Sequence, residues 1–331
     1  MHMQTGTFID LFSGAGLFSE AACQAGLEAK LAIDVSADAI QTYNANVRPV
    51  GVVGSVLDDW DVPQVDVLIA GPPCQGFSTL GRRDPKDERN SLSLSVAKWA
   101  EAAKPSIVVV ENVPPFLKSE HWHRLADRLN SQGYSIQTWI LEANEFGSPQ
   151  LRRRAFTLAS RIGVLNEPKP SGRTAKAGDV FDLPIAPDDP MHTWPMPSEL
   201  AAKRMHMIPP KGDKRDVMRA APDLCPPSWE RVGCHATDVW GRIDPAKPSN
   251  TIRCTFQNPS KGRYIHPTEH RVISLREAAR LQGVPDGWVF AGKPYPIARQ
   301  IGNGVPVHLG RAVMQAVSEK LDVETSELLA A

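Results

Sequence analysis

A cysteine at the end of an apolar run is the first residue in this chain whose type and position could do chemistry. Pro72-Pro73-Cys74-Gln75 directly follows the run 65–71, and that run predicts a buried strand. Two prolines with a locked φ would hold the thiol in a fixed place at the carboxyl end of the strand. A thiolate is a strong nucleophile when its pKa is lowered or a base lies nearby. The segment therefore indicates a presented nucleophile, and the alternative is a buried structural cysteine.

A carboxylate and two arginines follow other apolar runs. Glu111 comes after the four apolar residues 107–110, so it is either a functional group that shares a proton with a substrate or a helix cap or surface residue. In the segment 150–154, strand alternation would place Arg152 and Arg154 on one face. Both guanidinium groups could then reach the same anionic or carbonyl-bearing substrate, and a solvated basic edge is the alternative.

A glycine-containing loop opens the chain. The predicted strand 7–11 leads into Phe12-Ser13-Gly14-Ala15-Gly16, and Asp34 stands about 20 residues further on, where an acid often binds ribose hydroxyls. Ser19 occupies the position of the third glycine of a dinucleotide fingerprint. The loop therefore favours a nucleoside cofactor without pyrophosphate over NAD, and a tight turn without a ligand is the alternative.

These residues need a scaffold, and the first half of the chain predicts one. Short β-rich runs alternate with helical segments to about residue 160, which predicts an α/β fold with a doubly wound, mostly parallel sheet. The expected strands are 7–11, 29–33, 50–53, 65–70, 107–110, 135–141 and 155–159, with helices starting at Ser36, Ser91 and Ser119. In such a sheet the glycine loop, Cys74 and Glu111 lie on one edge and face one crevice.

Prolines change the character of the chain after Arg161. Twelve of them fall between residues 168 and 227, yet Trp194, Trp229 and Trp240 favour an ordered, loop-rich second domain over disorder. Ser274 and Glu277 form a capping box for a short helix. A last helix of roughly 307–321 is expected after a turn at 302–304.

Composition sets further limits. The 331 residues are 42% hydrophobic, with 37 basic and 37 acidic side chains, so any nucleic-acid binding would need a local basic face. The apolar runs are too short to span a bilayer and the N-terminus resembles no signal peptide, so we expect a cytoplasmic location, associated with the nucleoid if DNA is the substrate. Five cysteines without CxxC spacing indicate a reduced protein with no disulfide framework and no metal. A metal site at Cys225, Cys234, His235 and Cys254 is the weaker alternative.

Six segments in order resemble the cytosine-C5 DNA methyltransferases, which use S-adenosylmethionine. They are 8–16 (FIDLFSGAG), 71–78 (GPPCQGFS), 111–113 (ENV), 150–154 (QLRRR), 276–285 (REAARLQGVP) and 300–306 (QIGNGVP). The resemblance implies that Cys74 attacks C6 of a flipped cytosine and that C5 takes the methyl group of S-adenosylmethionine, giving 5-methylcytosine and S-adenosylhomocysteine. Glu111 would bind the base at N3 and the exocyclic amine, and Arg152 and Arg154 would help to hold it.

The resemblance also implies the remaining site residues. The cofactor would be lined by Phe12, Ser13, Gly14, Ala15, Gly16, Asp34, Val35, Ser55, Pro73 and Asn303. The loop 81–90 would close over DNA, and the residues expected to contact DNA are Gln75, Ser78, Arg82, Arg83, Arg89, Arg253, Lys261 and Arg263. The chain departs from the family pattern at Ser55, where an aspartate often contacts the adenine amine, at Leu17 in place of a second glycine, and at Asn90.

The resemblance extends to domains and partners. Residues 1–162 with 296–331 would form the catalytic, cofactor-binding domain, and 163–295 the target-recognition domain with its supporting helix. The expected substrate is double-stranded DNA methylated at a specific sequence, with a cognate restriction endonuclease as functional pair and the enzyme as a monomer. A tRNA cytosine-5 methyltransferase and a catalytically silent DNA-binding homologue are the alternatives.

Overall fold

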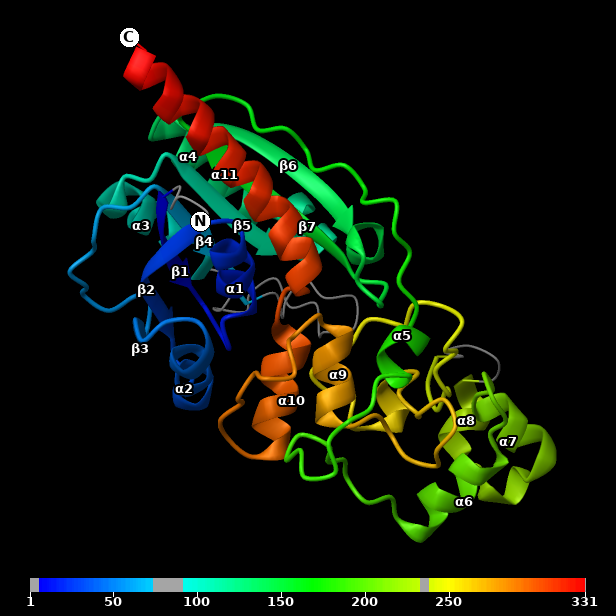
Figure 1. Ribbon diagram of the computed structural model, residues 1–331. Helices are drawn as coiled ribbons and strands as arrows, with labels where there is room; N and C mark the ends of the chain where they lie inside the picture. The colour runs from blue at the N-terminus through cyan, green and yellow to red at the C-terminus, as the bar shows by residue number, and fades with distance from the viewer. Residues whose placement is uncertain (1–5, 74–91, 233–237, 331) are drawn as a thin grey trace.

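A seven-stranded sheet forms the centre of the larger part of the molecule (Figure 1). The computed structural model describes residues 6–73, 92–232 and 238–330, and statements about structure refer to these residues. The sheet order is β3-β2-β1-β4-β5-β7-β6. Its strands are β1 (Gly6–Leu11), β2 (Leu27–Asp34), β3 (Gly51–Val53), β4 (Val67–Ala70), β5 (Ile107–Asn112), β6 (Ser135–Glu142) and β7 (Arg153–Ser160). All seven predicted strands are confirmed, with small shifts at their ends.

The sheet is mixed because one strand is reversed. The pairs among β1 to β5 are parallel, whereas β7 is antiparallel to both β5 and β6. The first residues of β7 therefore lie at the same edge as the last residues of β5. This reversal brings the arginine segment to the edge at which β1, β4 and β5 end.

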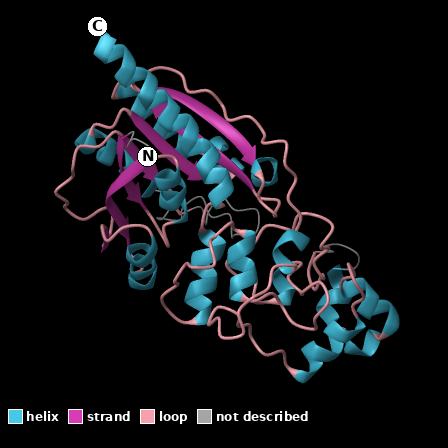
Figure 2. Cartoon of the chain, in the orientation of Figure 1, coloured by secondary structure: helices cyan, strands magenta, loops and turns pink. Residues whose placement is uncertain are grey.

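Helices cover both faces of the sheet (Figure 2). They are α1 (Leu17–Gln24), α2 (Ala37–Asn46), α3 (Ser95–Ala103), α4 (Glu120–Ser131) and α11 (Val307–Ala330), with short 3-10 turns η2 (Pro114–Lys118) and η3 (Ala143–Phe146). Ser36 and Ser119 cap α2 and α4 as predicted. The helix expected from Ser91 begins at Ser95, and Ser91 itself lies outside the described residues. The last helix runs further than the expected end near residue 321.

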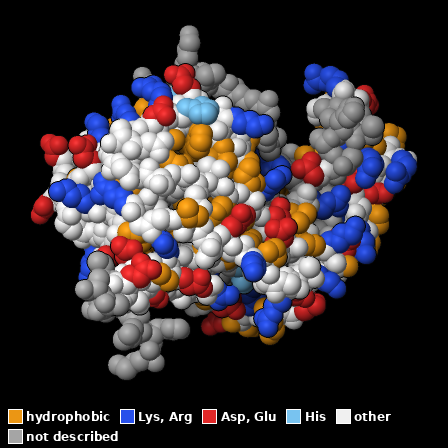
Figure 3. Space-filling view, turned by 90° about the horizontal axis from the view of Figure 1, so that it is seen from above, with side chains coloured by type: hydrophobic (Ala, Val, Ile, Leu, Met, Phe, Trp, Pro, Cys, Tyr) orange, Lys and Arg blue, Asp and Glu red, His pale blue; other side chains and the backbone are white. Residues whose placement is uncertain are grey.

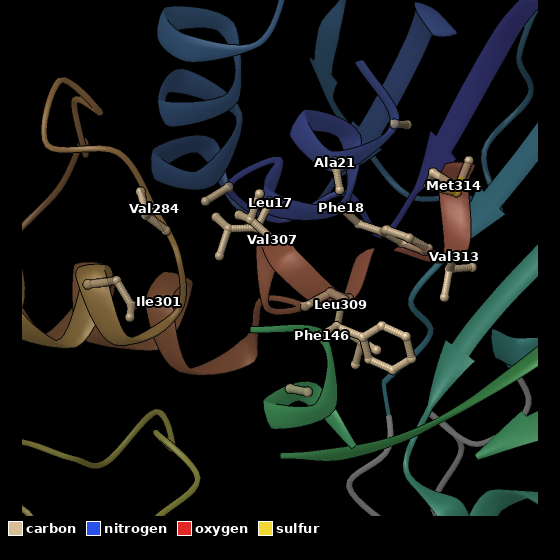
Figure 4. Packing of buried hydrophobic residues seen from close by; sticks show 14 of the residues in the cluster. Leu17, Phe18, Ala21, Phe146, Val284, Ile301, Val307, Leu309, Val313 and Met314 are labelled. Carbon is tan, nitrogen blue, oxygen red and sulfur yellow. The ribbon is translucent and has the colours of Figure 1, made fainter. Parts of the chain in front are cut away.

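Strand alternation explains the two-sided core. On one face, Phe8, Val67 and Val109 pack against α1 and α11. On the other face, Ile9 and Leu68 pack with residues of α3 and α4. Figure 4 shows Leu17, Phe18 and Ala21 of α1 among Leu309, Val313 and Met314 of α11. The C-terminal helix thus packs directly beside the helix that follows the glycine loop.

The second part of the molecule is helical and has its own small core. Its elements are α5 (Gly178–Phe181), α6 (Glu199–Met207), α7 (Lys214–Ala220), η4 (Pro222–Leu224), α8 (Pro227–Val232) and η5 (Pro259–Lys261). Met205, Val217, Trp229, Trp240 and Ile265 pack together there. Short helices fit between the prolines, which explains why the pattern predicted no long element. None of the helices in the described ranges is long and apolar enough to cross a membrane.

Two helices lie between the sheet and this second part (Figure 1). α9 (Leu275–Leu281) starts at the predicted capping box, in which Ser274 and Glu277 bond each other's backbone N–H groups. α10 (Pro294–Asn303) was not predicted, and the turn expected at 302–304 is wrong because Gly302 and Asn303 belong to its last turn. Pro294 and Pro296 lie in its first turn, where proline is tolerated.

Candidate active site

The strand ends at the carboxyl edge of the sheet are tied together by hydrogen bonds. The Gly71 N–H donates to Leu11 O (3.1 Å), and the Asn112 side-chain amide donates to Pro72 O (3.2 Å). Asn112 is almost fully buried, so its amide fixes the chain just before the proposed nucleophile. Cys74 itself lies outside the described residues, as do Gln75, Ser78, Arg82, Arg83 and Arg89.

An ion pair occupies the same edge. Arg154 Nε lies 2.7 Å from Glu111 Oε1, and the two side chains are only 14% and 12% exposed. Glu111 is the fifth residue of β5 and therefore caps no helix. A Cβ built on Gly71 would lie 3.8 Å from Glu111 Oε2, so the carboxylate stands beside the chain that leads into Pro72-Pro73. The structure thus brings together Glu111, Arg154 and the entry to the proline-cysteine segment.

Arg152 lies elsewhere. Its Nη1 donates to Ile252 O (2.7 Å) and its Nη2 to Gly302 O (2.9 Å), and the side chain is buried. Its backbone N–H donates to the Glu142 carboxylate. The two arginines that alternation would place together therefore have different neighbours: Arg154 contacts the carboxylate, whereas Arg152 contacts backbone carbonyls of two distant segments.

The loop after β1 has the backbone conformation that its glycines allow. Phe12 (φ 60°), Gly14 (φ 52°) and Gly16 (φ 87°) all have positive φ. A Cβ on Gly16 would lie 2.7 Å from Val47 Cγ2 and 2.8 Å from Tyr43 Cδ2, so no side chain fits there. A Cβ on Gly14 would have no atom within 4 Å, so the loop is open on that side.

Asp34 joins this loop to the end of β2. Its Oδ2 accepts from Gly14 N (3.0 Å) and its Oδ1 from Ser36 N (2.8 Å). Each carboxylate oxygen has a further lone pair, so the side chain can still accept ribose hydroxyls. The Ser13 Oγ is buried and has no hydrogen-bond partner among the described residues. A loop with open space, a carboxylate and an unpartnered hydroxyl fits a polar nucleoside ligand.

The remaining predicted cofactor residues lie along this edge of the sheet or near it. Ala15 is buried and Pro73 is half-buried, whereas Val35 and Asn303 are exposed. Ser55 is half-buried, and its backbone is used within its own turn: its N–H donates to Asp58 Oδ2 (2.8 Å) and its carbonyl accepts from Trp60 Nε1 (2.8 Å).

A buried carboxyl group below the loop was not predicted. Asp10 accepts a hydrogen bond from Ser19 Oγ (2.6 Å), which in turn accepts one from Tyr43 Oη (2.9 Å). Burial raises the pKa of Asp10 to about 8 against the effect of the Ser19 hydrogen bond, and the nearby Asp34 charge raises it further. Ser19 therefore has a structural partner at the position where a dinucleotide fold carries a third glycine. No local pattern could indicate this, because the three groups come from β1, α1 and α2.

The predicted DNA-contacting residues of the second part differ in how many hydrogen bonds their side chains make within the protein. Lys261 is exposed, and Arg253 Nη1 donates to its carbonyl (2.9 Å). Arg263 is only 19% exposed, and its guanidinium bonds the carbonyls of Lys211, Gly212 and Arg242 as well as Asp213. Arg263 thus stabilises the fold of this part. Figure 3 shows Lys and Arg side chains on both sides of the indentation between the two parts of the molecule.

Two solved methyltransferases share this fold. The chain superimposes on the Entamoeba histolytica methyltransferase EhMeth with a TM-score of 0.69 at 15% identity, covering 95% of this chain and 98% of that one. The Schizosaccharomyces pombe Dnmt2 methyltransferase gives a TM-score of 0.67 at 19% identity, covering 97% and 99%. The fold is therefore that of the class I methyltransferases.

The sequence comparisons narrow this class to one family. A family model described as C-5 cytosine-specific DNA methylase matches residues 6–319, and the chain belongs to that family of DNA cytosine-5 methyltransferases. The type II methyltransferase M.DdeI of Desulfomicrobium norvegicum is 29% identical, over 94% of this chain and 88% of the relative. M.XorII of Xanthomonas oryzae is 30% identical, over 97% and 87%. M.Eco47II of Escherichia coli is 30% identical, over 96% and 79%.

Proposed function

We propose that this protein methylates C5 of a cytosine within a specific sequence of duplex DNA, with Cys74 as the nucleophile. The observation that carries the proposal is the Glu111–Arg154 ion pair beside Gly71. This pair lies at the edge of the sheet where the chain enters Pro72-Pro73 and where the glycine loop follows β1. The reaction needs a carboxylate, a segment that carries a thiol and a nucleoside-binding loop, all at one edge of the sheet.

Each proposed group has a defined task. The Cys74 thiolate adds to C6 and leaves an electron pair at C5, which takes the methyl group. Loss of the C5 proton then restores the 5,6 double bond and expels the thiolate. Glu111 binds N3 and the exocyclic amine of the base, and Arg154 holds that carboxylate in place from the side. Because C6 is inaccessible in stacked duplex DNA, the cytosine must be flipped into the crevice.

The cofactor site is proposed on the loop after β1. Methyltransferases of this family use S-adenosylmethionine, which supplies an electrophilic methyl group. The open face of Gly14, the unpartnered Ser13 Oγ and the Asp34 carboxylate support its binding here, with Asp34 accepting ribose hydroxyls. Phe12, Val35 and Asn303 would line the same site.

We further propose that residues 163–295 select the target sequence and that 1–162 with 296–331 perform the reaction. Part of the segment 163–295, around Trp229 and Trp240, has a core of its own, which supports this division. Because the relatives are named type II methyltransferases, a separate restriction endonuclease would share the recognition sequence.

The proposal is tested with purified protein, labelled S-adenosylmethionine, duplex DNA of mixed sequence and tRNA. We expect label in duplex DNA only, as 5-methylcytosine at one sequence by bisulfite sequencing. Cys74→Ser should lose methylation by at least about a thousandfold while still binding S-adenosylhomocysteine. The matched control, Cys225→Ser, changes a half-buried thiol of the second part and should keep full activity.

A trapping experiment tests the covalent step. Fluorine at C5 cannot leave as a proton does, so DNA with 5-fluorocytosine at the target should form a stable adduct with wild-type protein and not with Cys74→Ser. Methylation of tRNA alone, or a fully active Cys74→Ser protein, would refute the proposal.

A further inference from the structure

Three buried polar side chains lie where the start of β7, the end of α9 and the segment around Ile252 meet. They are Gln150 and Arg152, just before β7, and Gln282, at the end of α9, and they are 0%, 2% and 0% exposed. Gln150 Nε2 donates to Gln282 Oε1 (2.6 Å) and to Leu281 O (2.8 Å). We call this group the buried joint.

The joint holds both backbone groups of Ile252. Gln150 Oε1 accepts from Ile252 N (3.1 Å), and Arg152 Nη1 donates to Ile252 O (2.7 Å). Backbone pairing continues the attachment, because Ser249 N donates to Pro149 O (2.9 Å) and Leu151 N to Ser249 O (2.8 Å). Hydrogen bonds from a charged donor are stronger than those between neutral groups. The Arg152 guanidinium therefore contributes more than the other donors to holding residues 249–252 in place.

The same guanidinium also holds the end of α10. Arg152 Nη2 donates to Gly302 O (2.9 Å), and Gln282 Nε2 donates to Ile301 O (2.5 Å). A Cβ on Gly302 would lie 2.2 Å from Cys254 N, so the backbone of α10 touches the backbone of residues 253–254. The next residue of α10 is Asn303, which we assign to the cofactor site.

This attachment of Ile252 would fix the position of its neighbour Arg253. It directly follows Ile252, its side chain is 36% exposed, and its guanidinium reaches Lys261 O (2.9 Å) and lies 3.9 Å from Asp238. Unlike Arg263, it is available to a DNA ligand at the boundary between the two parts of the molecule. A shift of Ile252 would move Arg253 with it.

We infer that Arg152 is a positioning residue for DNA recognition and does not touch the target base. It fixes residues 252–254 against the end of α10 and so sets where Arg253 meets DNA relative to the cofactor site. Arg154, beside Glu111, is then the arginine of this segment that acts at the base. The inference rests on the proposed function, because it assigns a role within that reaction.

The test compares Arg152→Lys with Arg154→Lys, and uses the exposed neighbour in Arg153→Lys as the matched control. Lysine keeps the charge but cannot bond two carbonyls through one planar fork. Arg152→Lys should raise the KM for DNA about tenfold and reduce discrimination against sites with one changed base pair. Its single-turnover rate at saturating DNA and cofactor should stay within about threefold of wild type. Arg154→Lys should show the reverse, and Arg153→Lys should show neither effect.

Amide hydrogen exchange provides a readout that needs no activity. Arg152→Lys should speed exchange in residues 249–256, and Arg153→Lys should not. A wild-type protein that methylates no DNA would refute the proposed function, while the exchange data would still decide whether Arg152 holds this segment.

The inference is wrong if Arg152→Lys lowers the saturating rate with an unchanged KM and unchanged discrimination, or if it matches wild type in every measurement. If Arg152→Lys does not fold, Thr251→Val replaces it as the test variant. Thr251→Val removes only the hydrogen bond from Thr251 Oγ1 to Leu151 O (2.7 Å) and so weakens the same attachment. It should shift KM and discrimination in the same direction, by about threefold, and an effect on the saturating rate alone would overturn the inference.

Discussion

Replacing Asp10 by Asn should stabilise the protein, and more so as the pH rises. Asp10 is 2% exposed near the end of β1, and burial raises its pKa to about 8, well above the usual value for an aspartate. The folded protein therefore binds a proton that the unfolded chain releases above about pH 4. Stability falls as the pH rises between these two values, because ionising the buried carboxyl is costly in the folded state. An asparagine keeps an oxygen that can accept the Ser19 hydrogen bond and has no proton to lose.

The size of the effect follows from the shift. Each unit of pKa difference corresponds to about 1.4 kcal/mol, so the whole range from acid to alkaline pH is worth at most about 6 kcal/mol. Most of this lies below neutral pH. Between pH 6 and pH 8 the stability of wild type relative to Asp10→Asn should fall by about 2 kcal/mol.

The difference in the free energy of unfolding between wild type and Asp10→Asn is measured by urea unfolding, monitored by circular dichroism, at several pH values between about 6 and about 8.5. Subtracting the variant from wild type removes the contributions of other titrating groups, and Asp61→Asn, at an exposed acid, is the matched control. A free-energy difference that is independent of pH, or one that shifts in favour of wild type as the pH rises, would refute the assignment of a neutral Asp10.

Two further substitutions test the loop and the α9 capping box. Gly16→Ala should lower the free energy of unfolding by about 2–3 kcal/mol and weaken S-adenosylhomocysteine binding, because its Cβ would meet Tyr43 at 2.8 Å. Gly14→Ala should lower it by only about 1 kcal/mol, because a Cβ there meets open space. Equal losses for the two variants in urea unfolding would contradict the packing argument. Burial raises the pKa of Glu277, but the hydrogen bonds and charge of Arg271 outweigh this and lower it. Glu277→Gln should therefore cost about 3 kcal/mol at pH 7. This difference should shrink as the pH falls below about 4, because the unfolded wild-type chain then binds a proton that folded Glu277, with its lowered pKa, does not yet bind. A constant difference from pH 7 to pH 3.5 would contradict it.

Local patterns predicted much of the fold. The seven strands come from short apolar runs, and Ser36, Ser119 and Ser274 cap helices as expected. These signals depend on neighbours within one turn or one strand, so they can be recognised without knowing the tertiary contacts. Where a residue allows two local structures, the pattern failed: the prolines of α10 fit both a loop and a first helical turn.

The chain order of the motifs also indicated that the glycine loop and Glu111 share one edge, because parallel strands end on the same side. The sequence did not indicate that β7 runs antiparallel to β5, which is what places Arg154 against Glu111. Nor did it indicate that Arg152 turns to Ile252 and Gly302, or that Ser19 pairs with Asp10.

Residue types and their order were therefore sufficient to define the strands, the helix caps and the family, because each depends on short-range patterns. The partners of Asp10, Arg152 and Arg154 depended on how strands and helices pack. A buried polar group must find its hydrogen-bond partner wherever the fold places one. For Arg152 these partners are carbonyls about 100 and 150 residues further along the chain, a distance over which no sequence pattern extends.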